Sequence, residues 1–500
     1  MDTKRRSPAR GPVTDPTEPS FLATRAGVLT LLLLCAVQFL DVVDGSIVNV
    51  ALPSIEHSLR FSQQNLQWVA TGYVLTYGGF LLLGGRAADL LGRRRVLVAG
   101  VVVFAACSLV AGLARTETTL IGARLAQGVG AALMAPAALS LVTTSFKEGV
   151  DRHKALGIWG AISGLAAATG VFLGGVLSQG PGWRWVFFVN LPLCAVILVA
   201  AFRLLDGDRP HRPRRAFDLT GAVLATGSVL LLVYGLIQAP DHGWESTHSL
   251  GAFTASALLL VAFVGNERRS RSPLIPLSIF RVPGLVAADV TQLVAFAGFY
   301  ATFFFLTLYM QNILGWSPIE AGAAYLPVTL GLGISASISP RLFARLGTRP
   351  VLVGGAMLAA GGVFMLSRIP SHGTYAADVL PGLVVMSLGL GAIFVGATVA
   401  ANAGVPAGQA GLAAGLLNTS LQVGIAVGLA VFSALATTRT QHLLAAHTNP
   451  AHALVGGYGL ALRAAGIFLA AAGLVALGTV NSREDTTPLP PTAEPAPESY

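Results

Sequence analysis

Long apolar runs alternate with short polar segments along most of the chain. Because a helix needs about 20 largely apolar residues to cross a bilayer, each run of that length predicts one membrane span. The pattern therefore predicts an all-α polytopic membrane protein. Fourteen spans are expected: six within 27–205, two within 218–265 and six within 285–480, with the last two at about 411–436 and 458–480.

The composition supports this interpretation. Charged residues make up 11% of the chain and hydrophobic residues 54%, with a mean hydropathy of +0.69, whereas a soluble domain carries about 25% charged residues. Ionisable side chains are depleted because each costs about 2.5–3.5 kcal/mol at the centre of a bilayer. The pI of 9.9 would suit a nucleic-acid partner, but the basic residues lie in alternate loops, so we expect no nucleic acid.

The positions of the 32 Lys and Arg residues orient the spans. Cytoplasmic loops of membrane proteins carry an excess of these residues. With a cytoplasmic N-terminus, only Arg124 lies within a span, and the opposite side holds only Arg60, Arg115, Arg184, Arg368, Arg439 and Arg463. We therefore expect a multi-pass protein of the cell (cytoplasmic) membrane with both termini in the cytoplasm.

An internal repeat divides the chain into two halves. The segment RLFARLGTRPVLV (341–353) echoes RAADLLGRRRVLV (86–98), although Asp89 becomes Ala344. Two six-helix halves in parallel orientation, with substrate bound between them near the bilayer midplane, are a known transporter plan. The seventh and eighth spans are then an insertion between the halves.

The domain boundaries follow from these spans. The first apolar run extends to Pro53, which is too long for the core of a signal peptide, so we expect it to remain as the first helix. The tail at the C-terminus is rich in Pro, Glu and Thr, a composition typical of disorder. The expected domains are a cytoplasmic tail (1–25), an N-terminal six-helix bundle (26–205), two inserted helices with basic cytoplasmic flanks (206–283), a C-terminal six-helix bundle (284–480) and a disordered cytoplasmic tail (481–500).

Several motifs resemble those of one transporter family. GGRAADLLGRRR (84–95) resembles the cytoplasmic loop signature of the major facilitator superfamily, and DVVDGSIVNVALP (41–53) resembles the first-helix signature of its 14-helix drug:proton antiporters. There are two departures: Val171 replaces a proline usual in the fifth helix, and Leu90 occupies a position often held by Arg. Further matches, in chain order, are QWVATGYVL (67–75), LIGARLAQGVGAA (120–132), GWRWVFFVNLP (182–192), PLIPLSIFR (273–281) and SPIEAGAAYLP (317–327).

The resemblance implies the major facilitator fold, with two six-helix bundles plus two inserted helices. It also implies a proton-coupled antiporter that exports lipophilic or amphipathic small molecules, such as drugs or antibiotics, by alternating access. No cofactor is expected beyond the proton gradient, no enzyme constellation or phosphate-binding loop stands out, and a monomer is favoured. Two alternatives remain open: a facilitator-type exporter of one metabolite, such as an amino acid or siderophore, and a membrane sensor that does not transport.

Ionisable residues within spans are candidates for proton coupling, because charge in hydrocarbon is kept for function. Asp41 and Asp44 lie three residues apart in the first span, close to one helix face. Arg124 cannot lose its proton and needs a partner. One of the two acids would serve if the first and fourth helices face each other, as the resemblance implies. A static structural pair is the alternative.

The basic loop and three polar residues supply the other candidates. In the family picture, Asp89 docks on a helix N-terminus of the opposite half, so the loop acts as a cytoplasmic gate; marking topology is the simpler alternative. Asp289 could attract a cationic substrate, act as a second proton site or lie in the wet headgroup region. It is a candidate for the substrate cavity together with Gln127 and Gln38. The gate candidates are Arg86, Asp89, Gly92, Arg93, Arg94 and Arg95.

Small residues four apart predict close helix packing in lipid. Such glycine pairs fall in the fifth and thirteenth spans, which are equivalent helices of the two halves. A trio of histidines has a spacing of five, which does not bring the side chains to one helix face, so no metal site is expected. The glycines are Gly160, Gly164, Gly170, Gly174, Gly411, Gly415, Gly424 and Gly428, and the histidines are His442, His447 and His452.

Overall fold

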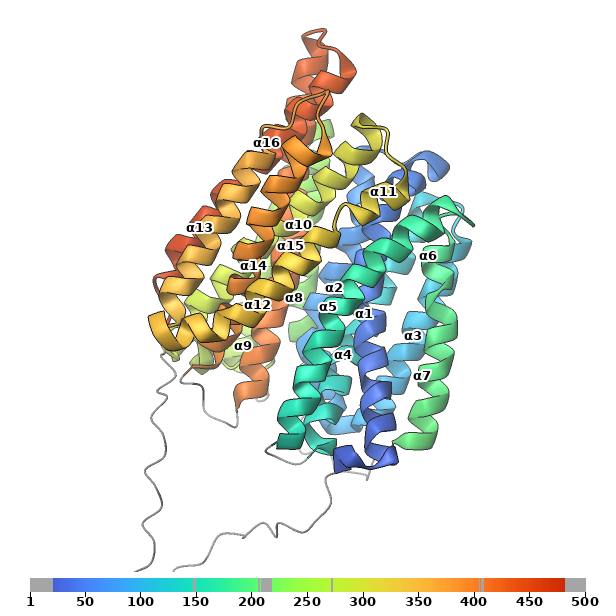
Figure 1. Cartoon of the computed structure of the whole chain (residues 1–500), viewed down its shortest axis with the longest axis vertical. Coiled ribbons are helices and arrows are strands. Elements are labelled where there is room, and N and C mark those ends of the chain that lie inside the picture. The colour runs from blue at the N-terminus through green and yellow to red at the C-terminus, as the bar shows by residue number, and fades with distance from the viewer. Residues whose placement is uncertain are drawn as a thin grey trace, which may run out of the picture.

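The computed structural model describes residues 21–146, 150–205, 207, 218–270, 273–403, 405 and 409–481. Within these ranges the chain is helical and contains no strand (Figure 1). Fourteen helices are long and apolar enough to cross a membrane. The predicted fold class is therefore confirmed, whereas the predicted tails at 1–25 and 481–500 lie almost wholly outside the described residues.

The N-terminal half and the insertion contain the first ten elements. The N-terminal half consists of η1 (Phe21–Ala23), α1 (Arg25–Leu59), α2 (Gln63–Leu91), α3 (Arg93–Leu113), α4 (Glu117–Ser145), α5 (Val150–Gln179), α6 (Trp185–Phe188) and α7 (Asn190–Leu204). The insertion consists of α8 (Leu219–His242) and α9 (Thr247–Arg269).

The C-terminal half follows a short 3-10 helix. That helix is η2 (Leu277–Arg281). The elements of the C-terminal half are α10 (Leu285–Leu308), η3 (Tyr309–Ile313), α11 (Pro318–Ala323), α12 (Leu326–Leu346), α13 (Thr348–Leu366), η4 (Tyr375–Val379), α14 (Leu380–Asn402), α15 (Ala410–Ala445) and α16 (Pro450–Ala476). Both η3 and η4 are π-helical turns.

Two helices extend beyond the predicted spans. α15 continues past residue 436 to Ala445, and α16 already begins at Pro450, capped by the side chain of Asn449. Arg439 and Arg463 consequently lie within helices and not in a loop. Hydropathy marks where hydrocarbon ends, whereas a helix continues as long as its backbone hydrogen bonds are satisfied.

The repeated basic loop has the same backbone in both halves. Gly92 joins α2 to α3 with a φ of 105°, and Gly347 joins α12 to α13 with a φ of 87°. These positive φ values favour glycine, because side chains with a Cβ are strained there. Arg94 donates to the carbonyl oxygen of Phe202 at 3.1 Å, and its repeat partner Arg349 donates to that of Thr479 at 2.6 Å. The loop is thus bound to the last helix of its half in the N-terminal half, and to the segment directly after the last helix in the C-terminal half.

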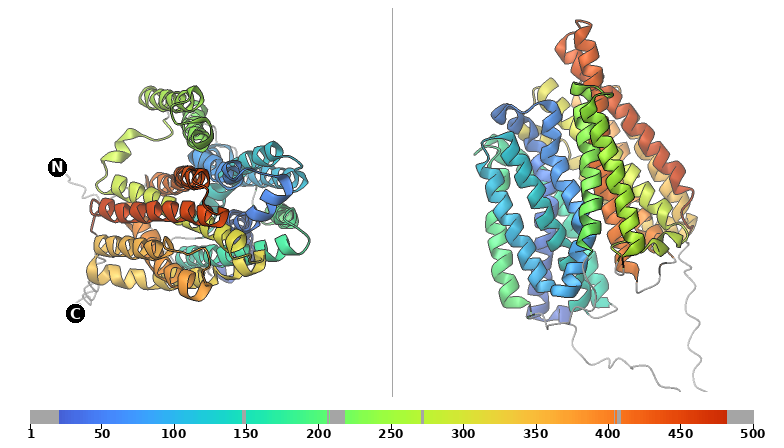
Figure 2. Two further views of the ribbon diagram at one scale, coloured as in Figure 1. Left: turned by 90° about the horizontal axis from the view of Figure 1, so that it is seen from above. Right: turned by 180° about the vertical axis from the view of Figure 1, so that it is seen from behind.

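The two halves form separate bundles, and two helix pairs make the most extensive contacts between them. α2 packs on α15, and α5 packs on α11. The inserted α8 and α9 pack on each other, and α8 also contacts both α2 and α15. Seen from above, the inserted pair lies at the rim of the molecule (Figure 2). The insertion therefore covers one side of the junction between the halves.

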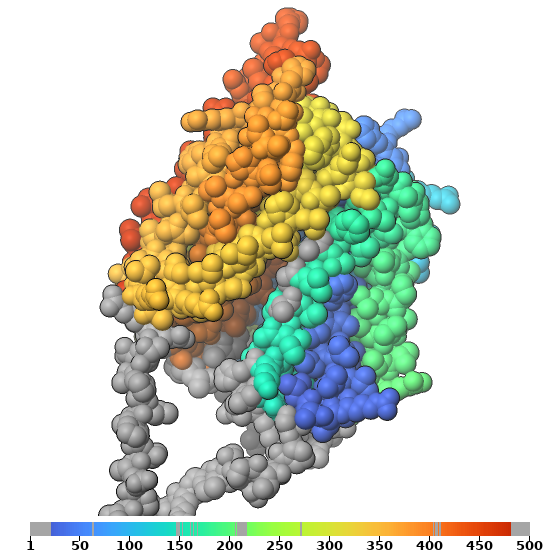
Figure 3. Space-filling model, viewed as in Figure 1, coloured from blue at the N-terminus to red at the C-terminus, as the bar shows by residue number. Residues whose placement is uncertain are grey.

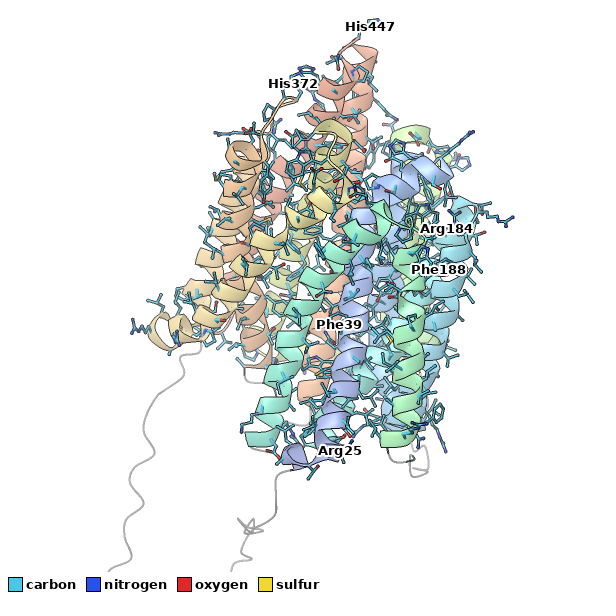
Figure 4. The ribbon with its side chains drawn as sticks, turned by 45° about the vertical axis from the view of Figure 1, so that its right-hand side comes forward. Arg25, Phe39, Arg184, Phe188, His372 and His447 are labelled. Carbon is cyan, nitrogen blue, oxygen red and sulfur yellow. The ribbon has the colours of Figure 1, made fainter. Side chains whose placement is uncertain are left out.

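The junction is closed at one end of the molecule and open at the other. Figure 4 shows Arg25 at one end and His447 at the opposite end, which we call the Arg25 end and the His447 end. At the His447 end, a Cβ on Gly175 of α5 would lie 2.6 Å from the Cα of Ile319 in α11. Toward the Arg25 end, α5 and α12 diverge, and Figure 3 shows a groove between them. On this face the two halves are therefore separated at the Arg25 end and joined at the His447 end.

Glycines permit the closest helix contacts inside each half. A Cβ on Gly174 of α5 would lie 2.6 Å from the carbonyl oxygen of Ile47 in α1. In the other half, a Cβ on Gly428 of α15 would lie 2.5 Å from the Cα of Ala297 in α10. Gly170 and Gly424 make equivalent close contacts with α1 and α10. The equivalent helices of the two halves are thus packed in the same way.

The other predicted packing glycines behave differently. Gly415 meets Leu82 of α2 across the junction of the halves. Gly160 is exposed, and a Cβ there would have nothing within 4 Å. The packing role predicted for Gly160 is therefore wrong in this conformation, because that side of α5 faces open space. Gly164 and Gly411 lie in α5 and α15, but their surroundings are not among those that the structure describes.

Candidate functional site

A fully buried ion pair lies in the N-terminal half. Arg124 of α4 places its Nη1 atom 2.6 Å from Oδ2 of Asp44 in α1. Asp44 is 0% exposed and Arg124 is 1% exposed. The partner expected for Arg124 among the two acids of the first helix is therefore Asp44.

The other carboxylate oxygen of Asp44 is occupied as well. Its Oδ1 atom accepts from Nε2 of Gln127 at 2.9 Å and from Nδ2 of Asn190 at 2.8 Å. Asn190 is the first residue of α7, and it also donates to the hydroxyl of Ser108 in α3. Since a buried charge is costly unless it is paired and hydrogen-bonded, this network supplies the ion pair and the hydrogen bonds that a buried carboxylate requires.

The guanidinium of Arg124 is held on its remaining sides by α2 and by an aromatic ring. Its Nε atom donates to the carbonyl oxygen of Val69 at 2.8 Å. Its central carbon lies 4.3 Å from the centroid of the Tyr73 ring, which is close enough for a cation–π interaction. Arg124 therefore ties together α1, α2 and α4 at a single point.

Asp41 occupies a separate pocket of hydrogen-bond donors. The hydroxyl of Tyr73 donates to its Oδ1 atom at 2.7 Å, and the hydroxyl of Tyr77 donates to its Oδ2 atom at 2.9 Å. Asp41 and Asp44 share no donor in the described structure. Tyr73 connects them, because its ring lies on Arg124 while its hydroxyl binds Asp41.

Two residues predicted for the substrate cavity have other contacts. Gln127 is fully buried and bound to both Asp44 and Arg124. The prediction that Gln127 lines an open cavity is therefore wrong, because both ends of its amide are hydrogen-bonded to the ion pair. Gln38 of α1 donates to the hydroxyl of Ser163 in α5 at 2.9 Å, so it links two helices of the same half.

The described contacts of Asp89, Arg93 and Arg94 among the predicted gate residues lie within their own half. Asp89 is 67% exposed, and its Oδ1 atom lies 3.7 Å from Arg93, one helical turn away. Arg94 contacts α7 of its own half, with its guanidinium 5.3 Å from the ring of Phe202. Arg95 is exposed, and the Nε atom of Arg86 is buried with no partner among the described residues. This loop lies at the open end of the molecule.

Comparison with known proteins decides the family. The sequence profile of the Major Facilitator Superfamily matches residues 34–429. This chain belongs to the major facilitator superfamily. The superfamily consists of transporters, in agreement with the helix count, the repeat and the two bundles described above.

Several antibiotic exporters and resistance proteins are similar to this chain. It is 38% identical to the puromycin resistance protein of Streptomyces alboniger, covering 91% of this chain and 92% of that protein. It is 40% identical to the cephamycin export protein of Amycolatopsis lactamdurans, covering 74% and 77% of the two chains. The multidrug resistance protein Stp of Mycobacterium tuberculosis is 36% identical over 78% of this chain and 72% of its own length.

Solved transporter structures share the fold. A bacterial homologue of the human lysosomal transporter Spinster, in an inward-facing and occupied conformation, superposes with a TM-score of 0.63 at 16% identity, covering 91% of this chain and 97% of its own. A peptide transporter of the POT family in complex with sulfate gives 0.63 at 18% identity, covering 90% and 95%. At such identities the likeness concerns the fold alone.

The facilitator fold also brings together residues that sequence reasoning did not single out. Asn49 of α1 and Tyr300 of α10 exchange two hydrogen bonds, at 2.9 and 3.2 Å, across the two halves. Gln311, in the π-helical turn η3, donates to the carbonyl oxygen of Val50 at 3.0 Å. The sequence did point to Asn49, because this residue lies inside the first-helix motif at 41–53. Tyr300 and Gln311 carried no signal, because only packing shows what they face.

Proposed function

We propose that this protein is a proton-coupled antiporter that exports lipophilic or amphipathic small molecules, antibiotics among them, across the cytoplasmic membrane by alternating access. It acts as a transporter and not as an enzyme. Its partners are the exported molecule, protons and the surrounding lipid, and it works as a monomer with both termini in the cytoplasm. The similarity to puromycin, cephamycin and multidrug resistance proteins supports the choice of cargo.

The single observation that carries the coupling proposal is the buried pair of Asp44 and Arg124. A proton that reaches Asp44 neutralises the carboxylate while Arg124 remains charged. The attraction that holds α1 against α4 is then lost, and with it the reason for Arg124 to stay in place. Breaking a buried pair changes the stability of an arrangement by about 3–5 kcal/mol, which is enough to shift an equilibrium between two conformations.

Alternating access requires two conformations, each open at a different end of the molecule. If the Arg25 end is cytoplasmic, as the distribution of basic residues predicts, the present conformation admits cargo from the cytoplasm. The contacts of Asn49 with Tyr300 and of Val50 with Gln311 close the opposite end. Export then requires these contacts to break while the Arg25 end closes.

We propose that the loop around Asp89 closes the Arg25 end. In the present state its carboxylate is exposed, and its ion-pair partner among the described residues is Arg93 of the next turn. When the halves approach, Asp89 can dock on a helix N-terminus of the opposite half. Such a contact contributes about 0.3–1 kcal/mol at an exposed site, which is enough to bias two states of nearly equal free energy.

Transport by inverted membrane vesicles tests the proposal. Uptake of a lipophilic cationic dye is measured with and without a proton gradient, for the natural protein and for Asp44→Asn. We expect uptake that collapses with the gradient and is lost in Asp44→Asn. Gradient-driven uptake that survives the substitution would remove Asp44 from coupling, and gradient-independent uptake would contradict antiport.

A narrow-specificity exporter is the second candidate. The observation that favours it is that the puromycin, cephamycin and lincomycin relatives are each named for a single antibiotic. A panel of dyes and antibiotics in the same vesicles separates the two candidates. Uptake of one chemical class alone would support the narrow exporter.

A further inference from the structure

Asp289 differs from the two acids of the first helix because neither of its oxygens is bound. It lies in α10 and is only 6% exposed, and no described residue donates to Oδ1 or Oδ2. By contrast, Asp44 accepts from three side chains and Asp41 from two tyrosines. A buried polar group without a partner is costly, so the Asp289 carboxylate has capacity for a donor that is not part of the described chain.

A second unpartnered acceptor lies beside it. Gln292 is one helical turn further along α10, is 2% exposed, and its Oε1 atom has no described donor. Residues three apart on a helix are neighbours on its surface. Two acceptor groups are therefore neighbours on α10, and neither has a hydrogen-bond donor among the described residues.

Helical spacing shows where this pair lies. Residues 289, 296 and 300 are spaced by seven and four, so they share one face of α10. Tyr300 binds Asn49 of the opposite half, so this face looks toward the junction of the halves. Asp289 lies nearer than Tyr300 to the start of α10, and therefore on the side of the Arg25 end, where Figure 3 shows the halves separated.

The same face is aromatic beyond Asp289. The ring of Phe296 lies 6.1 Å from that of Phe394 in α14 and 5.9 Å from that of Phe299. Phe303, two turns further, stacks on Tyr325 at 3.8 Å between ring centroids. An acid followed by aromatic rings along one helix face suits an organic cation, since the rings attract positive charge and accept an apolar body.

We propose that Asp289 and Gln292 form a recognition site for the protonated amine of a basic, partly aromatic cargo molecule, with the phenylalanine face receiving its apolar part. The ammonium N–H groups donate to the Asp289 carboxylate and to Oε1 of Gln292, and its charge compensates that of Asp289. Asp44 is unsuited to this role, because Arg124 already compensates its charge and it accepts three hydrogen bonds within its own half. The proposal rests on the proposed function, since it names the class of molecule that is exported.

Equilibrium binding to the purified full-length protein tests it without any gradient. The probes are monodansylcadaverine, a fluorescent primary amine that is protonated at pH 7, and its N-acetyl derivative, which has the same body but no charge. We expect the natural protein to bind the amine more tightly than the acetylated probe. Because a charge-assisted hydrogen bond is lost, Asp289→Asn should weaken amine binding about ten-fold or more and leave the acetylated probe unchanged.

Two further variants make the result specific. Asp289→Glu keeps the charge and should retain the preference for the amine. Asp241→Asn removes an acid bound to Gln441, outside the proposed site, and should bind both probes as the natural protein does. An unchanged amine affinity in Asp289→Asn would overturn the proposal, as would a natural protein that does not prefer the amine or shows no saturable binding.

The outcome is independent of proton coupling. If Asp289→Asn keeps the amine preference but loses gradient-driven uptake, Asp289 is a proton site and the proposed amine site is wrong. If amine binding depends on Asp289 but the natural protein shows no gradient-driven uptake, the recognition site stands and the antiport proposal fails.

Discussion

Arg124 and Asp44 are joined across 2.6 Å at a point where four transmembrane elements meet, and neither side chain is exposed by more than 1%. α1 supplies the acid and α4 the guanidinium, while α2 and α7 supply Val69 and Asn190 around them. A pair so enclosed responds to protonation and to substitution as one unit. The first predictions concern this unit.

Removing one partner of the pair should destabilise the protein more than removing both. Asp44→Asn leaves Arg124 buried without a counter-charge, which costs about 3–5 kcal/mol. The double variant Asp44→Asn/Arg124→Gln should recover part of this loss, because no unpaired charge remains. Thermal unfolding in detergent measures both, and additive losses would show that the two side chains are not coupled.

Tyr73 should affect both acids, whereas Tyr77 should affect only one. Tyr73→Phe and Tyr77→Phe each remove one hydrogen bond to Asp41, so we expect similar, moderate changes in the pH profile of transport. Tyr73→Leu also removes the ring beneath Arg124, so it should reduce gradient-driven transport well beyond either phenylalanine variant. The matched control is Tyr77→Leu, which leaves Arg124 untouched. Equal effects of the two leucine variants would contradict the link through Tyr73.

The hydrogen bonds between Asn49 and Tyr300 should hold the His447 end closed. Tyr300→Phe removes both, at a cost of about 0.5–1.5 kcal/mol for each bond, and should populate a conformation open at that end. Spin labels on Arg115→Cys and His372→Cys, in a protein without native cysteines, would report it as a longer distance. Tyr375→Phe is the control, because its hydroxyl binds Ala324 within one half. An unchanged distance distribution in Tyr300→Phe would rule out the closing role.

Asp89→Asn should slow transport with little change in stability. Its contact with Arg93 is exposed and long at 3.7 Å, and exposed pairs contribute about 0–1 kcal/mol. The larger effect is expected in the state closed at the Arg25 end, where the carboxylate would meet the opposite half. Transport rate and melting temperature measured on the same preparation separate the two effects. A large fall in melting temperature with a normal rate would assign Asp89 a structural role.

The local pattern of the sequence predicted much of the architecture. Fourteen spans, the repeat at 86–98 and 341–353, and the need of Arg124 for an acidic partner could all be inferred from it. Hydropathy indicates whether a segment lies in lipid or in water, and a buried Arg requires a counter-charge wherever it lies. Glycine at 92 and 347 likewise follows from the turn that each basic loop makes.

Only the tertiary structure decided which side chains meet. Asp44 and not Asp41 pairs with Arg124, and Gln127 serves that pair and not a cavity. Asn190 reaches Asp44 from 146 positions away in the chain. The physical reason is that a partner depends on how helices from distant segments are rotated and packed against each other. Hydropathy, which depends on neighbouring residues alone, carries no information about that rotation, nor about the lack of a hydrogen-bond donor to Asp289 among the described residues.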